Sequence, residues 1–207
     1  MNALDLSAFE TTPLRTDPYE HVIVPGFVRS EALAAIRDAF PRVGKPGSFP
    51  VCELAYGDAF ADLLDDLDGV GFEAFVADKF GIDLSGRAKL FTVRGRCQAK
   101  DGRIHTDSLT KIITVLIYLN PGWEADAGRL RVLRGPEDLD DYAAEIPPLA
   151  GTLFAFRRSD RSYHGHEQYE GERRAIQVNW MTDARTRDRE IVRHRVSARI
   201  KRLNPFG

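Results

Sequence analysis

The character of the sequence changes near residue 89, and this change constrains the fold more than any other feature. Before it, residues 59–67 and 73–80 carry apolar side chains at spacings of three and four, which predicts helices. After it, the apolar segments are short, rich in β-branched and aromatic residues, and separated by Gly, Pro, Asp and Asn. The predicted strands cover residues 90–93, 112–119, 130–133, 152–156 and 175–180. Strands that follow one another without helices between them favour an antiparallel sandwich or barrel.

Three further elements are predicted outside these strands. Residues 21–27 form a short strand that ends at Pro25-Gly26, and Ser30 is a candidate N-cap for a helix to about Phe40. Residues 183–203 form a C-terminal helix, and its many arginines are expected to be a solvated face around an apolar stripe. The stripe consists of Val192, Val196, Ile200 and Leu203.

The 207 residues contain no segment that resembles a linker, which favours a single domain over residues 1–207. Within it, residues 1–88 are mainly helical support, residues 89–182 the β core, and residues 183–207 the C-terminal helix. A net charge of −2 gives no general reason to expect nucleic acid as a partner. No signal peptide is evident, and the longest apolar stretch is too short to cross a membrane, so we expect a cytoplasmic protein. Cys52 and Cys97 are expected to be reduced thiols without a role.

The placement of the five histidines points to a metal site. His105 and Asp107 form an H-x-D pair, and residues two apart on an extended chain point to the same side. A third ligand could come from the segment that contains His164 and His166. Two imidazoles and one carboxylate are the facial triad of non-haem iron(II) oxygenases, which leaves three coordination positions open. By itself an H-x-D pair is weak evidence, since it also occurs in solvated loops.

The surrounding motifs and their order are more specific. The motif residues, in order, are His105-x-Asp107, Ile113-Thr-Val-Leu-Ile-Tyr-Leu-Asn120, Gly128-Arg-Leu-Arg-Val132, Pro148-Leu-Ala-Gly-Thr-Leu-Phe-Ala-Phe156, Ser162-Tyr-His164 and Gly171-Glu-Arg173. Over residues 90–180 the chain therefore resembles the prolyl-hydroxylase-like branch of the iron(II)- and 2-oxoglutarate-dependent oxygenases. This resemblance implies a mainly β fold with flanking helices, a double-stranded β-helix or jelly roll, with N-terminal helices that support one sheet.

The resemblance also implies roles for particular residues. His164 follows a serine and an aromatic residue, as the ligand does in the family, so iron(II) would be bound by His105, Asp107 and His164. His166 would then lie behind the metal ligands or face the substrate, or it would be a partly exposed strand histidine. His21 and His194 have no other ligand types nearby, so we interpret them as structural or solvated.

In the family, 2-oxoglutarate chelates the metal and leaves one position for dioxygen, and its far carboxylate is bound by an arginine. Arg173 is the counterpart here, and Tyr118 would place its hydroxyl on the same carboxylate unless it is an ordinary strand aromatic with a surface hydroxyl. Many relatives place the basic residue one position later, at Arg174. Alternation favours Arg173, because it shares a strand face with Ala175 and Gln177, whereas Arg174 shares a face with larger apolar residues.

The resemblance therefore predicts an iron(II)- and 2-oxoglutarate-dependent dioxygenase. It would hydroxylate an unidentified protein residue, amino acid or small metabolite and release succinate and carbon dioxide. The carboxylate of Asp107 argues against the halogenating relatives, which lack it. Two alternatives are a cupin-type metal enzyme that does not use 2-oxoglutarate and a non-catalytic jelly-roll binding module. An anionic substrate would suit a group of arginines near the mouth of the barrel, unless these are solvated. The group consists of Arg94, Arg96, Arg129 and Arg131.

Overall fold

The structure, a computed structural model, describes residues 3–203, and their side chains up to residue 196. Its helices are α1 (Leu6–Thr11), α2 (Ser30–Asp38), α3 (Asp58–Asp68), α4 (Val70–Phe80) and α5 (Ala184–Leu203), with a 3-10 turn at Val51–Glu53. Its strands are β1 (His21–Val24), β2 (Phe49–Pro50), β3 (Lys89–Cys97), β4 (Lys111–Tyr118), β5 (Leu130–Leu133), β6 (Tyr142–Ile146), β7 (Leu153–Arg157), β8 (His164–Gly165) and β9 (Gly171–Met181). No helix in this described part is long and apolar enough to cross a lipid bilayer.

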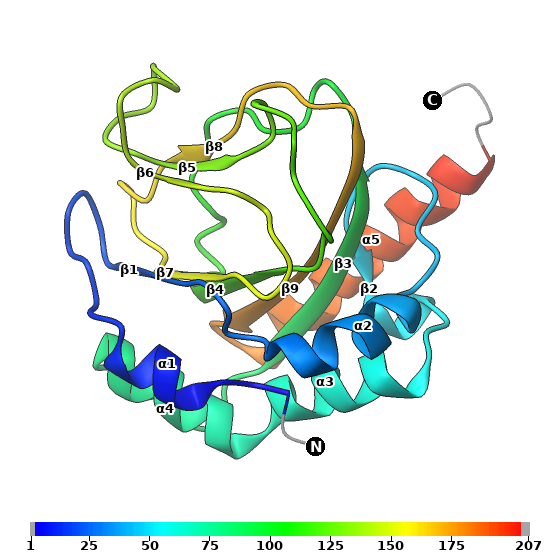
Figure 1. The fold of residues 1–207 in the computed structure, drawn as a ribbon, viewed down its shortest axis with the longest axis horizontal. Coiled ribbons are helices and arrows are strands. Elements are labelled where there is room, and N and C mark those ends of the chain that lie inside the picture. Colours follow the sequence, from blue (N-terminus) through cyan, green and yellow to red (C-terminus); the bar gives the residue numbers. More distant parts are fainter. Residues whose placement is uncertain (1–2, 204–207) are drawn as a thin grey trace.

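The strands form two sheets that face each other. The larger sheet has the order β1-β7-β4-β9-β3-β2, and the smaller has the order β6-β5-β8. All pairings within both sheets are antiparallel. In Figure 1 the smaller sheet lies above the larger one, and helices α1 to α4 cover the opposite face of the larger sheet. The fold is the predicted double-stranded β-helix with N-terminal helical support.

Alternation along the central strands assigns each residue to one of two layers. On β9, Ile176, Val178 and Trp180 are fully buried in the core shared with the N-terminal helices. The intervening residues of β9 face the smaller sheet, where Ala175 packs with Tyr118 of β4. The large sheet is therefore supported from behind by an apolar layer, and its inner face contributes to a second apolar cluster with the small sheet.

Aromatic packing attaches the N-terminal helices to this sheet. Phe72 of α4 lies within about 6 Å, ring centre to ring centre, of Phe9, Phe27 and Trp180. The Trp180 indole also donates a hydrogen bond of 3.1 Å to the Glu73 carboxylate. Helix α4 ends at Gly81, which has a φ of +57°, the left-handed conformation that glycine adopts most readily. These helices therefore hold the back of the sheet in place.

Most predicted elements are present, with corrections at their ends. Ser30 is the first residue of α2 and its hydroxyl contacts Glu31, so the predicted N-cap is wrong and Arg29 occupies that position. The elements α1, β2, β6 and β8 were not predicted, because β2 and β8 have only two residues each and the other two are short or half-exposed. Cys52 and Cys97 are free thiols, the first exposed and the second buried.

The C-terminal helix α5 is present, and the part of its apolar stripe whose side chains the structure describes is exposed. Val192 and Val196 are 55% and 51% exposed, and Ile200 and Leu203 lie outside the described side chains. Asp183 caps the helix by accepting a 2.8 Å hydrogen bond from the Thr186 amide. The helix packs against β2, β3 and β9.

Candidate active site

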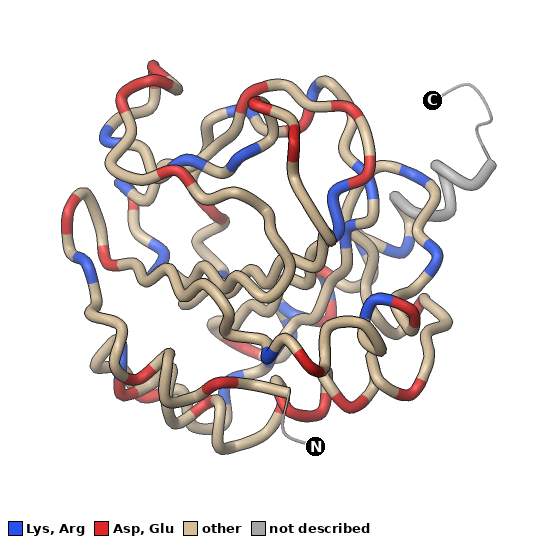
Figure 2. Tube along the Cα trace, in the orientation of Figure 1, with Lys and Arg blue, Asp and Glu red and all other residues tan. Residues whose placement is uncertain are grey.

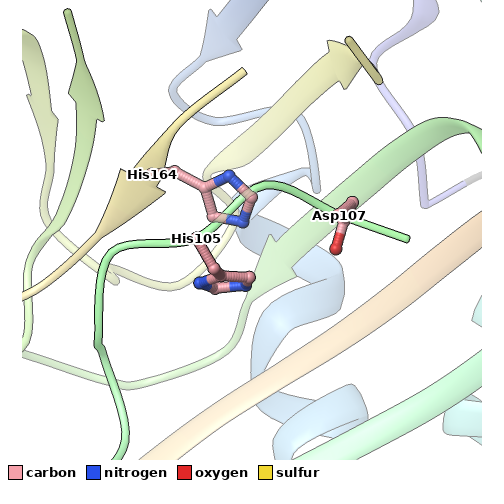
Figure 3. Close-up of side chains that lie close together, drawn as sticks. All are labelled: His105, Asp107 and His164. Carbon is pink, nitrogen blue, oxygen red and sulfur yellow. The ribbon is translucent and has the colours of Figure 1, made fainter. Parts of the chain in front are cut away.

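Three side chains that are far apart in the sequence meet between the two sheets. His105 and Asp107 lie on the segment between β3 and β4, and His164 begins β8. The backbones of His105 and His164 are joined by two hydrogen bonds of 3.0 and 3.1 Å. One ligand atom from each of the three residues lies within 4.8 Å of the others, and Figure 3 shows the two rings side by side with the Asp107 carboxylate across from them. The structure thus brings together the three residues predicted to bind a metal.

The hydrogen bonds of the two histidines prepare them for a cation. The Nδ1 atom of His105 is 2.9 Å from the Arg103 carbonyl, and that of His164 is 3.0 Å from the Ser162 carbonyl. A carbonyl can only accept, so each Nδ1 carries the proton and each Nε2 has a free lone pair. Metal-bound histidines are oriented in this way in proteins. The donor set therefore fits a divalent transition metal such as iron(II).

Charged and polar neighbours hold the Asp107 carboxylate. Thr114 donates a 2.5 Å hydrogen bond to Oδ2, and the Lys111 ammonium lies 2.8 Å from Oδ1. Burial by itself raises the pKa of Asp107, but Lys111, His164 and Thr114 outweigh it and the net pKa is lowered. Asp107 is thus an anion already positioned for a cation.

Burial also keeps His164 neutral. Loss of solvation lowers the pKa of His164 to about 4, although the Asp107 charge acts in the opposite direction. A neutral imidazole is the form that binds a metal. His164 is therefore ready to act as a ligand at neutral pH without first losing a proton.

Arg173 of β9 extends into the same cavity. Its side chain is buried, donates from Nε to the Gly128 carbonyl at 3.0 Å, and donates from a terminal nitrogen to the Tyr118 hydroxyl at 3.2 Å. Among the described residues no carboxylate forms an ion pair with it. A buried guanidinium that lacks an anion is costly, which indicates a site for a bound carboxylate.

Tyr118 is fully buried, so the alternative of a hydroxyl at the surface is wrong. Burial raises its pKa, while Arg173 opposes that shift. Its neutral hydroxyl still has a proton to donate. A carboxylate bound at Arg173 could therefore receive a second hydrogen bond from Tyr118.

Arg174 lies on the other side of the strand. It pairs with Glu172 and its guanidinium is 5.5 Å from the centre of the Phe40 ring, in a separate surface depression. The structure therefore places Arg173 in the cavity and Arg174 outside it.

Gly128 was not recognised as a site residue from the sequence, although it belongs to one of the family motifs. Its φ is +78°, and an added Cβ would lie 2.7 Å from the Trp123 ring. The Gly128 carbonyl accepts the Arg173 Nε hydrogen bond. Glycine at this position therefore allows the backbone to approach closely enough to orient Arg173.

His166 forms part of the cavity wall. It is buried, so the alternative of a partly exposed strand histidine is wrong, and its Nδ1 donates to the Glu167 carbonyl at 2.8 Å. Burial, and secondarily Arg173, lowers its pKa to about 4. The ring packs over Gly102, whose carbonyl accepts a 2.8 Å bond from the His166 amide. His166 thus supports the turn that precedes the metal-binding segment.

We predict that Gly102→Ala destabilises the protein. Gly102 has a φ of +90°, and an added Cβ would collide with the His166 ring and carbonyl. Strain and overpacking should cost about 2 kcal/mol in the free energy of unfolding, measured by urea denaturation. Gly44→Ala is the matched control, because Gly44 has open space around it and no left-handed φ. Equal unfolding midpoints for the two variants would contradict the packing described here.

The cavity around these residues has a volume of about 460 Å³. Helix α5 contributes Glu190, Arg193 and His194 to its lining. The sequence did not indicate this role, and His194 was interpreted as structural or solvated, because position on a helix does not reveal which cavity the helix borders. His21, the other histidine interpreted in that way, is buried and donates to the Tyr19 carbonyl at 2.8 Å.

Only one of the four arginines expected near the mouth lies there. Arg94 lines the cavity, whereas Arg96 borders the separate depression beside Arg174. Arg129 and Arg131 are paired with acidic residues of the smaller sheet and its loops, among them Glu145. Arg94 and Arg96 are two residues apart and would share one face of a regular strand, but the pairing of β3 with β9 is irregular between them, so the sequence spacing did not predict their separation.

Comparisons with known proteins agree with this geometry. Residues 96–182 match the family described as the 2OG-Fe(II) oxygenase superfamily, where 2OG is 2-oxoglutarate. No curated protein sequence matches the chain at a significant level.

Several solved structures share the fold. A prolyl-4-hydroxylase from Pseudomonas putida aligns with a TM-score of 0.54 and 17% identity, covering 87% of this chain and 94% of that one. The viral collagen prolyl hydroxylase of Paramecium bursaria Chlorella virus-1, solved as a 2OG complex, aligns with a TM-score of 0.55 and 13% identity. The alignment covers 79% of this chain and 96% of that one. An oxidoreductase of the 2OG-Fe(II) oxygenase family from Burkholderia pseudomallei aligns with a TM-score of 0.55 and 12% identity. The alignment covers 85% of this chain and 90% of that one. At these identities the likeness shows the fold alone.

Proposed function

Because this chain belongs, through residues 96–182, to the 2OG-Fe(II) oxygenase superfamily, we propose that it hydroxylates its substrate at the site formed by His105, Asp107, His164 and Arg173. The observation that carries the proposal is that the metal-ligand set and a buried arginine without a carboxylate partner line one cavity. A metal-binding module or a cupin-type enzyme would have no need of the second feature.

In this proposal each residue of the site has a defined role. His105, Asp107 and His164 would hold iron(II). Arg173 and Tyr118 bind the far carboxylate of 2-oxoglutarate. When bound, iron(II) and 2-oxoglutarate activate dioxygen, and the substrate is hydroxylated as succinate and carbon dioxide are released.

The rest of the inner surface orients these groups. Thr114 bridges the Asp107 carboxylate and the Asn179 side chain, with contacts of 2.5 and 3.0 Å, so the acidic ligand is fixed to β9. The Gly128 carbonyl holds Arg173 by accepting a hydrogen bond from its Nε. The two facing sheets thus hold metal ligands from two segments, and Tyr118 and Arg173 from β4 and β9, in fixed positions, as a reaction that requires ordered binding needs.

We expect the purified protein to convert 2-oxoglutarate slowly to succinate when supplied with iron(II) and oxygen, even without its substrate. N-oxalylglycine, which resembles 2-oxoglutarate but is not oxidised, should inhibit this turnover. Succinate is measured by chromatography, and stimulation by added peptides, amino acids and metabolites identifies the substrate. Metal-loaded protein that forms no succinate with any of them would favour the non-catalytic binding module instead.

A further inference from the structure

The charges that line the active-site cavity do not balance. Its cationic side chains are Arg94, Lys100, Arg103, Lys111, Arg173 and Arg193. Its carboxylates are Asp101, Asp107 and Glu190. The lining therefore has twice as many cations as anions, in a protein whose net charge is −2.

Each of the three carboxylates already has a cationic partner. Asp101 pairs with Arg94 at 2.7 Å, and Asp107 pairs with Lys111 at 2.8 Å. Glu190 pairs with Arg193 on the same helix. Within the described side chains, residues 3–196, this leaves three cavity cations without an ion-pair partner. They are Lys100, Arg103 and Arg173.

The proposed function, on which this inference rests, accounts for only one of these three. Arg173 binds the far carboxylate of the cosubstrate. Lys100 and Arg103 remain without an anion after iron(II) and the cosubstrate have bound. Their surplus charge faces the same cavity in which the substrate must be held.

These two residues lie on a turn with a defined shape. The Asp101 amide donates to the Gln98 carbonyl at 2.9 Å, and the Asp101 carboxylate accepts from Arg94 and from the Gln98 amide. The Asp101 carboxylate is therefore already occupied by Arg94 and by the Gln98 amide. Lys100 and Arg103 are exposed and stand at the rim, two residues before the metal ligand His105 at their nearest.

Within residues 3–196, no carboxylate forms an ion pair with Lys100 or Arg103, the two cations of this rim. Figure 2 shows many acidic positions along the N-terminal helices, on the side of the large sheet away from the cavity. A rim that carries two free cations favours an anion, because Lys and Arg both form charge-assisted hydrogen bonds with carboxylates and phosphates.

We propose that the substrate carries a carboxylate or phosphoryl group, and that Lys100 and Arg103 bind this group while the carbon to be hydroxylated lies over the metal. The two cations would act as specificity-determining residues. They recognise a part of the substrate that does not react.

The proposal can be tested without knowing the substrate. Isotope-labelled protein is loaded with zinc(II), a diamagnetic substitute for iron(II), and saturated with N-oxalylglycine so that Arg173 is occupied. Acetate, methylphosphonate and the neutral acetamide are then titrated while backbone amide signals are followed by NMR. We expect saturable shifts of residues 98–103 with at least one of the anions and none with acetamide, and the tighter anion identifies the preferred group.

Two variants make the result specific. The double variant Lys100→Gln, Arg103→Gln should raise the dissociation constant of the anion at least fivefold. Arg134→Gln should leave it unchanged, because Arg134 is exposed and pairs with Asp141 away from the cavity. Equal shifts with acetamide, no shifts in residues 98–103 with either anion, or undiminished binding by the double variant would each overturn the proposal. Failure of N-oxalylglycine to bind in the preceding titration would count against the proposed function instead.

Discussion

Asp107→Ala is expected to weaken metal binding by more than about a hundredfold, because replacing groups that merely orient metal ligands already costs roughly ten- to a hundredfold. The variant removes the single carboxylate of the ligand set. It also leaves Lys111 without its partner, so a positive charge would face the incoming cation. Isothermal titration with manganese(II), an inert substitute for iron(II), measures the dissociation constant.

Two controls separate this effect from unfolding and from a general loss of negative charge. Asp107→Asn keeps the size of the side chain and should also bind metal weakly. Asp141→Ala removes an exposed carboxylate that pairs with Arg134, and it should bind metal normally. Tight manganese(II) binding by folded Asp107→Ala would show that the metal ligands have been misidentified.

Arg173→Ala is expected to raise the dissociation constant of 2-oxoglutarate roughly thirtyfold or more, since an unpaired buried carboxylate costs on the order of 2 to 5 kcal/mol. Arg173 is buried between Gly128 and Tyr118 and has no carboxylate partner of its own. The measurement is calorimetric titration of the metal-loaded protein with 2-oxoglutarate.

Arg174→Ala is the matched control, one residue along the same strand. Its side chain pairs with Glu172 outside the cavity, so its loss should change the dissociation constant little. Saturating 2-oxoglutarate should raise the thermal unfolding temperature of the protein. This increase should disappear in Arg173→Ala and persist in Arg174→Ala. The opposite order of effects would assign the cosubstrate to Arg174.

Periodicity and local spacing were sufficient for the outline of the fold. Before residue 89 the apolar residues recur at helical spacing, and after it they form short β-type segments, which reflects the local preference of the backbone. Strand β3 begins at this change, at Lys89. The H-x-D pair is local too, because two residues of separation place His105 and Asp107 on one side of an extended segment. The period of a strand also separated Arg173 from Arg174, since neighbouring side chains point to opposite faces.

Other features depended on contacts between distant segments. The Arg173 side chain is oriented by the Gly128 carbonyl, 45 residues away in the chain. The turn that carries Lys100 and Arg103 is supported by the hydrogen bond from the His166 amide to the Gly102 carbonyl. No local pattern contains either contact, because each arises only when both sheets have formed.

The sequence by itself determined which residues could be ligands, which segments are strands and which face of β9 carries Arg173, since these follow from residue chemistry and from the period of the backbone. Only the tertiary structure decided which charges remain unpaired. Arg94, Arg129 and Arg131 are neutralised by carboxylates from other segments, whereas Lys100 and Arg103 are not. It also brought Glu190 and His194 of α5 to the cavity, although the apolar stripe of that helix suggested another orientation. The physical reason is that ion pairing and helix docking depend on distances in space, which spacing along a chain does not specify.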